Sequence, residues 1–184
     1  MYSVNGPSEA IADASVDAVP FDIEALFRAH YVRVARIVAR VVRDRARSEE
    51  LAVEVFLKLW RNRKVRGENV EGWLYRVALR TGLDELRRQT RRAHYERLLA
   101  AVWPKPMPAT PEEIHSATEE QERVRMVLSV LDSRQAEFLL LRCQDFTYDE
   151  VASLLKLNPA SIGTLVGRAQ QSFRKEYIRR YGQE

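Results

Sequence analysis

The sequence has little of what several common classes of protein require. Cys143 is its only cysteine, which excludes an intrachain disulfide framework, and its apolar neighbours predict a packed core position for it. Seven glycines and seven prolines among 184 residues leave long stretches without a helix breaker, which disfavours a turn-rich β fold. No window approaches the ~20 apolar residues that span a bilayer, and the N-terminus lacks the basic start of a signal peptide. We therefore expect an all-α protein that is soluble and cytoplasmic.

Sequence signals of catalysis are absent as well. There is no phosphate-binding glycine loop, no paired-histidine metal motif and no nucleophile elbow. His30, His94 and His115 lie far apart in the sequence and belong to no recognisable motif. These absences argue against a helical enzyme, and we expect neither a catalytic site nor a bound metal or cofactor.

Positive charge is concentrated in one part of the chain. Residues 21–98 hold 19 basic and 11 acidic residues, a net charge of +8, whereas residues 119–184 hold 10 of each. The first 20 residues hold three acidic residues and no basic one. The expected partner of the 21–98 segment is therefore a polyanion.

Apolar periodicity predicts three helices in this basic segment. The first spans residues 21–42, where apolar side chains recur every three or four positions. The second is expected to start near Ser48, with two glutamates in its first turn, and to end before Gly67. The third is expected to begin after a cap at Asn69 and to run toward Arg97.

The third predicted helix carries an unusual concentration of arginines. Arg87 and Arg91 are four residues apart, as are Arg88 and Arg92, so both pairs lie on neighbouring strips of one surface. Like charges at this spacing repel each other unless an anion relieves the repulsion. The pattern therefore favours an anion-binding role. The alternative, a protein that serves only as an interaction adaptor, does not explain why these arginine pairs are present.

A proline-rich stretch interrupts the helical pattern. Four prolines fall within residues 103–111, which leaves little room for a helix and predicts an extended linker. The alternative is an internal loop of a single domain, which the length disfavours. The predicted organisation is a mobile tail (1–20), a helical domain (21–98), an extended linker (99–118) and a second helical domain (119–184).

The second domain contains several helix start signals. Residues 132–135 resemble a capping box, and residues 147–150 form a better one. After a short break, Asn158 is a good N-cap and Pro159 suits the first position of a helix that extends to about Tyr181. Two capped helices joined by a tight turn are typical of a helix-turn-helix, whose second helix reads base edges in the major groove.

In this order, the segments resemble the extracytoplasmic-function (ECF) sigma factors of bacteria. The resemblance covers residues 21–97 as sigma region 2 and residues 123–177 as region 4. The segments that carry it are Ser48–Trp60 (polymerase clamp binding), Gly72–Ala78 with Asp84–Arg88 (promoter melting and −10 reading), Leu131–Gln135 with Phe146–Ala152 (start of region 4), and Arg168-Ala169 in the recognition helix.

The resemblance implies a transcription initiation factor whose partners are core RNA polymerase and promoter DNA, with an anti-sigma factor as a further candidate and no membrane insertion. The residues implied at the polymerase are Glu49, Glu50, Leu51, Glu54, Phe56 and Leu59. Those implied at the separated −10 strands are Arg66, Asn69, Trp73, Tyr75, Arg76, Arg80, Arg87, Arg88 and Arg91. Those implied at the −35 duplex are Thr147, Ser161, Thr164, Arg168, Gln171 and Lys175. A plain core role stays open for Leu51 and Phe56, and for Trp73 burial is favoured over stacking on a base.

The sequence departs from the family pattern at three places. Val53 stands where the family often has Gln, Arg80 where it often has Asn, and Gly163-Thr-Leu165 where it commonly has Lys-Ser-Arg. The second departure predicts an altered −10 base preference, and the third removes cations from the first turns of the recognition helix. The remaining alternative is a helix-turn-helix regulator that binds duplex DNA alone, which the neutral second domain disfavours.

Overall fold

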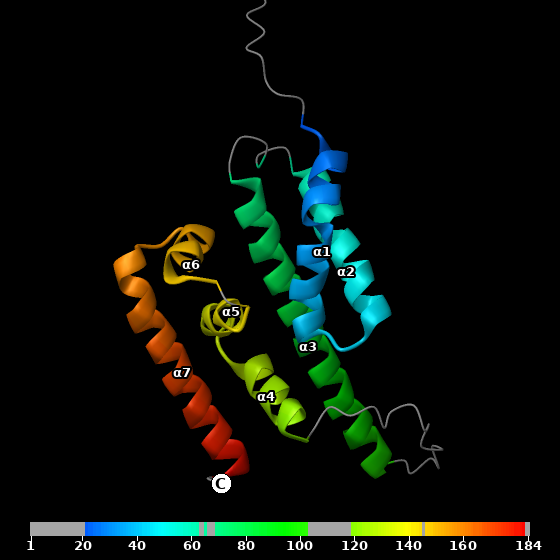
Figure 1. Cartoon of the computed structure of the whole chain (residues 1–184). Helices are drawn as coiled ribbons and strands as arrows, with labels where there is room; N and C mark the ends of the chain where they lie inside the picture. Colours follow the sequence, from blue (N-terminus) through cyan, green and yellow to red (C-terminus); the bar gives the residue numbers. More distant parts are fainter. Residues whose placement is uncertain (1–20, 63–64, 66–68, 103–118, 145, 183–184) are drawn as a thin grey trace, which may run out of the picture.

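The computed structural model describes residues 21–62, 65, 69–102, 119–144 and 146–182. The predicted N-terminal tail and Arg66 therefore lie outside the described residues. The described part is made of helices and contains no strand, which confirms the all-α fold class (Figure 1). The helices are α1 (Ile23–Val41), α2 (Arg45–Arg61), α3 (Val70–Val102), α4 (Glu119–Val130), α5 (Ser133–Arg142), α6 (Tyr148–Leu155) and α7 (Pro159–Tyr181).

Helices α1, α2 and α3 pack together along the basic segment (Figure 1). Asp22 caps α1 by accepting hydrogen bonds from the backbone N–H groups of Glu24 and Ala25, both at 3.0 Å. The helix buries one apolar stripe against its two neighbours, as the periodicity predicted, and Gly82 of α3 allows α1 to come close. A Cβ atom added at Gly82 would lie 3.3 Å from the Cβ of Val41.

The predicted start of α2 was wrong. The helix begins at Arg45, because Asp44 caps it with a 3.0 Å hydrogen bond from the backbone N–H of Arg47. Ser48 lies inside the helix and is buried, and its hydroxyl donates to the backbone carbonyl oxygens of Val42 and Asp44. The predicted glutamate pair therefore follows the first turn instead of lying in it.

Helix α3 begins as predicted but ends later. The side-chain oxygen of Asn69 accepts a 2.8 Å hydrogen bond from the backbone N–H of Gly72, which confirms the cap. The helix continues to Val102, so residues 99–102 are helical where the sequence predicted an extended linker. The proline-rich residues 103–118 lie outside the described residues.

Helices α5, α6 and α7 pack against one another. Thr147 and Glu150 make both arms of the predicted capping box, and Asn158 and Pro159 open α7 as predicted. Asp132 caps α5, but the side chain of Gln135 bonds to Ser172 of α7 and does not complete the second capping box. The core position predicted for Cys143 was wrong, because α5 ends at Arg142 and Cys143 is exposed at its C-cap.

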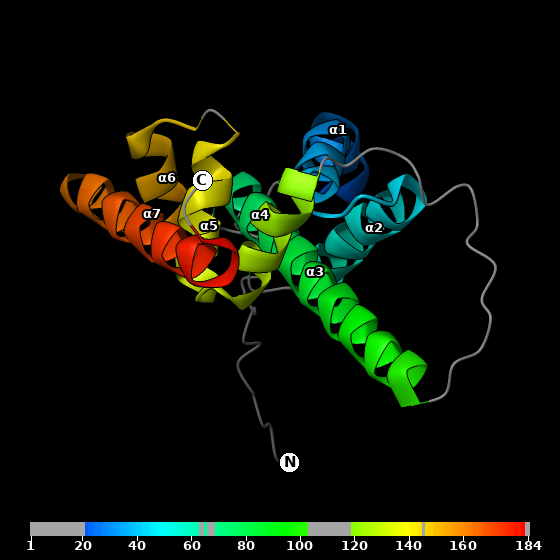
Figure 2. The ribbon, with the colours of Figure 1, turned by 90° about the horizontal axis from the view of Figure 1, so that it is seen from below.

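The first group of helices (α1 to α3) and the second group (α4 to α7) pack against each other in this structure. Helix α3 lies between α1 and α2 on one side and α4, α5 and α6 on the other (Figures 1 and 2). Their buried residues form one continuous cluster. The C-terminal end of α3 projects beyond the rest of the molecule (Figure 2). No helix in the described ranges is both long and apolar enough to cross a membrane.

Candidate polymerase and nucleic-acid interfaces

The six residues predicted to contact the polymerase lie on two different faces of α2. Glu49 and Glu50 are exposed and Glu54 is half-buried. Leu51, Phe56 and Leu59 are buried in the core. In this structure the three apolar side chains hold α2 against the other helices. This is the core role that the sequence left open for Leu51 and Phe56, and Leu59 has it too.

The three carboxylates pair with arginines of their own helix. Glu49 accepts a 3.0 Å hydrogen bond from Arg45, and Glu50 accepts a 2.8 Å bond from Arg47. Glu54 lies 3.7 Å from the same Arg47 guanidinium. Since these pairs lie at or near the surface, each is worth little, and cations of a partner can replace the arginines at low cost.

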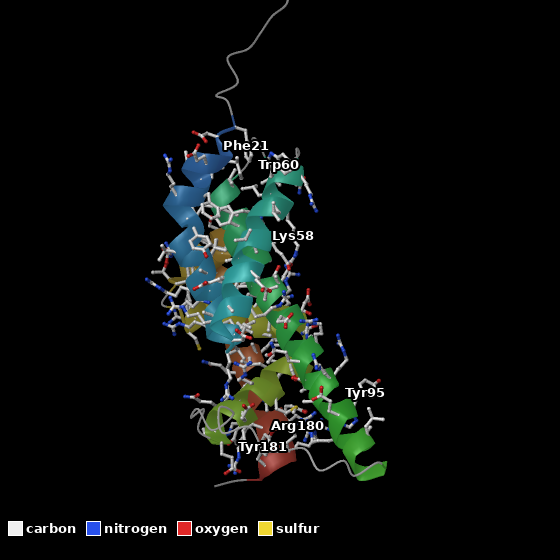
Figure 3. The ribbon with its side chains drawn as sticks, turned by 90° about the vertical axis from the view of Figure 1, so that its right-hand side faces the viewer. Phe21, Lys58, Trp60, Tyr95, Arg180 and Tyr181 are labelled. Carbon is white, nitrogen blue, oxygen red and sulfur yellow. The ribbon has the colours of Figure 1, made fainter. Side chains whose placement is uncertain are left out.

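Three apolar residues on the outer face of α2 were not among the residues predicted to contact the polymerase. Val53, Leu57 and Trp60 are 41%, 42% and 56% exposed, and their spacing places them on one stripe. Trp60 lies near the C-terminal end of α2 (Figure 3). The sequence did contain a signal for these residues, which is a second apolar stripe beside the buried one. A helix that packs through one face alone does not need a second apolar stripe.

The aromatic candidates of α3 face the interior. Tyr75 is 2% exposed, and its hydroxyl donates a 2.8 Å hydrogen bond to Glu71. Burial, together with this bond, raises the pKa of the Tyr75 hydroxyl to about 12. Trp73 is half-buried against the core, as favoured from the sequence. The buried Tyr75 ring is not placed to stack on a base in this conformation.

Arg87 is turned toward the second group of helices. Its guanidinium donates to the carbonyl oxygens of Ser129 at 3.2 Å and Leu131 at 3.0 Å. It also donates to the hydroxyl of Ser133 at 2.9 Å. These acceptors surround the turn between α4 and α5, where the last carbonyl groups of α4 lack helical partners. A cation is favourable at this helix end.

Arg76 and Arg80 face the same way. Arg76 donates to the carbonyl oxygen of Leu154 in α6. Arg80 donates a 2.8 Å hydrogen bond from Nε to the carboxylate of Glu137 in α5. Three of the arginines predicted to hold −10 DNA are thus engaged by the chain's own second half.

Arg88 pairs with a buried carboxylate of its own helix. Its guanidinium bonds both oxygens of Glu85, at 2.8 and 3.1 Å, and Arg47 reaches the same group at 3.3 Å. Burial acts to raise the pKa of the Glu85 carboxyl, but the hydrogen bonds from Arg88, Arg47 and Gln89 outweigh it, so the pKa is lowered.

The repulsion expected among the arginines of α3 is relieved largely within the molecule. Arg92 pairs with Glu96 at 2.7 Å, one turn further along the helix. Arg91 is exposed and makes no hydrogen bond or ion pair with any described residue. The inference that the arginine spacing requires an external anion therefore loses much of its force, and Arg91 is the member of the set that remains available.

Helix α7 presents a continuous polar stripe. Ser161, Thr164, Arg168, Gln171 and Lys175 are all exposed and alternate at spacings of three and four residues. The opposite face of α7 buries apolar residues against α5 and α6. Thr147 is exposed too, but its hydroxyl is occupied in the capping box.

Comparisons with known proteins identify the class to which this arrangement belongs. The family described as Sigma-70 region 2 matches residues 26–92, the segment that forms most of α1 to α3. The ECF RNA polymerase sigma factor SigK of Mycolicibacterium vanbaalenii is 30% identical over 162 residues, which cover 84% of this chain and 82% of that protein. The RNA polymerase sigma factor YlaC of Bacillus subtilis is 25% identical over 156 residues, which cover 83% of this chain and 90% of that protein.

A solved structure is also similar at lower identity. It is the sigma factor RpoE in complex with the anti-sigma factor NepR from Bartonella quintana, with a TM-score of 0.47 and 16% identity. The similarity covers 84% of this chain and 96% of that chain. The sequence matches define a bacterial sigma factor of RNA polymerase. More narrowly, this chain belongs to the family of ECF RNA polymerase sigma factors, which act in transcription initiation.

Proposed function

We propose that this sigma factor directs core RNA polymerase to promoters through two separate surfaces, in the cytoplasm. Helices α1 to α3 bind the polymerase and the melted −10 element, and α6 with α7 read the −35 element. The observation that carries the proposal is the placement of α2 and α7 on opposite sides of the molecule (Figures 1 and 2). One chain can therefore contact the enzyme and duplex DNA at the same time.

The proposed polymerase surface combines carboxylates with an apolar stripe. Glu49, Glu50 and Glu54 supply negative charge that steers a basic partner and fixes its register. Val53, Leu57 and Trp60 supply apolar area beside it, and an exposed tryptophan is the kind of residue that anchors protein interfaces. Leu51, Phe56 and Leu59 support this surface from inside.

The proposed −10 surface lies on α3. Arg91 is available in this structure, and Arg88 is 63% exposed although it is paired with Glu85. Phosphates of separated strands can join or replace such pairs, because the cationic side chains already face solvent. Arg76, Arg80 and Arg87 extend the same surface once their present acceptors move away.

The proposed −35 surface is the polar stripe of α7. Ser161 and Thr164 lie near its N-terminal end, the part of a recognition helix that approaches base edges. Arg168 supplies a cation one turn further along, and Gln171 and Lys175 continue the stripe toward the DNA backbone.

A transcription assay tests the proposal as a whole. Run-off transcription with core polymerase and a promoter library should yield discrete transcripts that depend on this chain. In gel shifts, stable promoter complexes should require the core enzyme. Strong binding of duplex DNA by the chain alone, without promoter-dependent transcripts, would instead establish an independent helix-turn-helix regulator.

A further inference from the structure

The arginines of α1 are not neutralised equally by carboxylates of the chain. Arg28 and Arg33 each have a carboxylate nearby, at 2.5 Å and 3.9 Å. Arg36 and Arg40 lie about one turn apart on the same helix, and neither forms an ion pair with any described residue. Because like charges at this spacing repel each other, this part of α1 favours a bound anion.

These arginines line an open groove of about 370 Å³. Arg33, Arg36 and Arg40 form its α1 wall, and the segment between α5 and α6 forms the opposite wall with Gln144 and Phe146. Arg33 lies 4.9 Å from the centre of the Phe146 ring and so joins the two walls. No carboxylate occurs among the described residues that line the groove, so its three cations make it a candidate anion site.

The groove also contains hydrogen-bond donors that the described chain does not use. Arg36 is exposed and makes no hydrogen bond with any described residue. Arg40 donates one 2.9 Å hydrogen bond to the carbonyl oxygen of Cys143, which holds its guanidinium at the groove and leaves its other donors free. The side-chain amide nitrogen of Gln144 is covered from solvent and lacks a partner among the described residues. Since an unpaired buried donor is costly, rotation of this side chain toward an acceptor in the groove is favourable.

The spacing of the cations and the apolar residues beside them define the ligand. A guanidinium pairs with a phosphate group through two parallel hydrogen bonds. Arg36 and Arg40 are separated by ~6 Å along the helix axis, so two phosphate groups of one molecule can each meet one guanidinium. Ala29 and Val32 line the groove toward the N-terminal end of α1, and Val32 is 65% exposed. They provide an apolar surface on which a sugar and a base can lie.

We propose that this groove binds a nucleoside diphosphate or a longer nucleoside polyphosphate. The phosphate groups lie at Arg36 and Arg40, and the nucleoside lies beside Val32. The site uses none of the residues that form the proposed polymerase, −10 and −35 surfaces. The inference therefore goes beyond the proposed function and does not rest on it.

The test uses the full chain without polymerase or DNA. Binding of ADP that carries a fluorescent N-methylanthraniloyl group on its ribose is followed by anisotropy at about 50 mM salt, where ionic contacts are only partly screened. Competition by unlabelled ADP gives the affinity of the unmodified nucleotide. We expect saturable binding with a dissociation constant of about 0.1 mM or below, on the order of what two ionic contacts in an open groove provide. ADP should also raise the melting temperature as its concentration rises.

Two variants probe the two parts of the site. Arg36→Ala should weaken ADP binding about tenfold, because it removes hydrogen bonds to a charged group. Since Arg36 is exposed and bonds to no described residue, this substitution should leave folding unchanged. Val32→Ser should weaken ADP binding about threefold by removing apolar contact with the nucleoside. It should not change competition by inorganic pyrophosphate, which has phosphate groups but no nucleoside.

Two arginines outside the groove provide matched controls. Arg28→Ala removes an exposed arginine from the same helix, and Arg174→Ala removes an exposed arginine of α7 that bonds to no described residue. Neither should change ADP binding, and a loss confined to Arg36→Ala supports the site. Equal losses in Arg36→Ala and either control would show non-specific binding to a basic surface and overturn the proposal, as would no saturable binding up to about 1 mM ADP. Pyrophosphate that binds as tightly as ADP, with Val32→Ser unaffected, would overturn the nucleoside assignment.

Discussion

Glu85 offers the sharpest test of how α3 is held in place. Its carboxylate is almost fully buried, and it accepts hydrogen bonds from Arg47 of α2 and from Arg88 and Gln89 of α3. Substitution by glutamine keeps the size of the side chain but removes the negative charge. We therefore expect Glu85→Gln to destabilise the protein without disturbing its core.

The magnitude follows from the partners. Breaking a fully buried ion pair costs roughly 3–5 kcal/mol. Here Arg88 is 63% exposed and regains water, and Arg47 keeps Glu50 at 2.8 Å. We therefore expect a smaller loss, about 1–3 kcal/mol in the free energy of unfolding, closer to the value of hydrogen bonds to a charged group. Urea denaturation at neutral pH measures it.

The pH dependence gives this prediction a second, independent check. The pKa of the Glu85 carboxyl is lowered in the folded state from its ordinary value of 4.5. Its contribution is therefore fully present above about pH 4.5 and is lost as the pH falls through the folded pKa. The stability difference between the wild type and Glu85→Gln should shrink in acid. A difference that persists at low pH, or no difference at neutral pH, would refute the reasoning. Glu96→Gln, which removes an exposed carboxylate from the same helix, should cause no measurable loss.

Three further predictions concern the proposed surfaces and the second group of helices. Trp60→Ala should weaken binding to core polymerase by tenfold or more, roughly 1.4 kcal/mol, in a fluorescence titration. Tyr95→Ala replaces another exposed aromatic residue and should not weaken binding, so equal losses in the two variants would contradict the α2 surface. Arg168→Ala should lower discrimination between promoter and non-promoter duplex in gel shifts more than it lowers binding to core polymerase, and equal loss of both would point to misfolding or to a wrong assignment of Arg168. Thr147→Ala removes the cap that bonds Glu150 and should cost about 1 kcal/mol of stability in thermal unfolding, and an unchanged melting temperature would contradict its role.

The helices could be predicted because their signals are local. Asn69, Thr147 and Asn158 cap helices as the sequence indicated, because a capping side chain needs only its own neighbours. The start of α2 was missed because Asp44 and Ser48 are both good caps, and nothing local decides between them. The apolar stripe that ends at Trp60 was missed because periodicity alone does not show which face is covered.

The interface between the two groups of helices has no local signal. Arg80 and Glu137 are 57 residues apart, and Glu137 reads in sequence as an ordinary solvent-facing residue of an amphipathic helix. The arginine spacing in α3 predicted a surface that needs an external anion. It did not reveal that carboxylates and carbonyl groups of the same chain meet much of that need, because such partners become evident only when distant segments are placed together.

The most direct test of the central claim is the salt dependence of promoter opening by the polymerase holoenzyme. Open complexes formed with the wild type and with the double variant Arg88→Ala, Arg91→Ala are compared by the fluorescence of 2-aminopurine in the −10 element over a range of salt concentrations. If α3 holds the separated strands, the slope of log K against log salt should fall by roughly 0.7 for each arginine that meets a phosphate. An unchanged slope together with unchanged opening would contradict the assignment of this helix to the −10 strands.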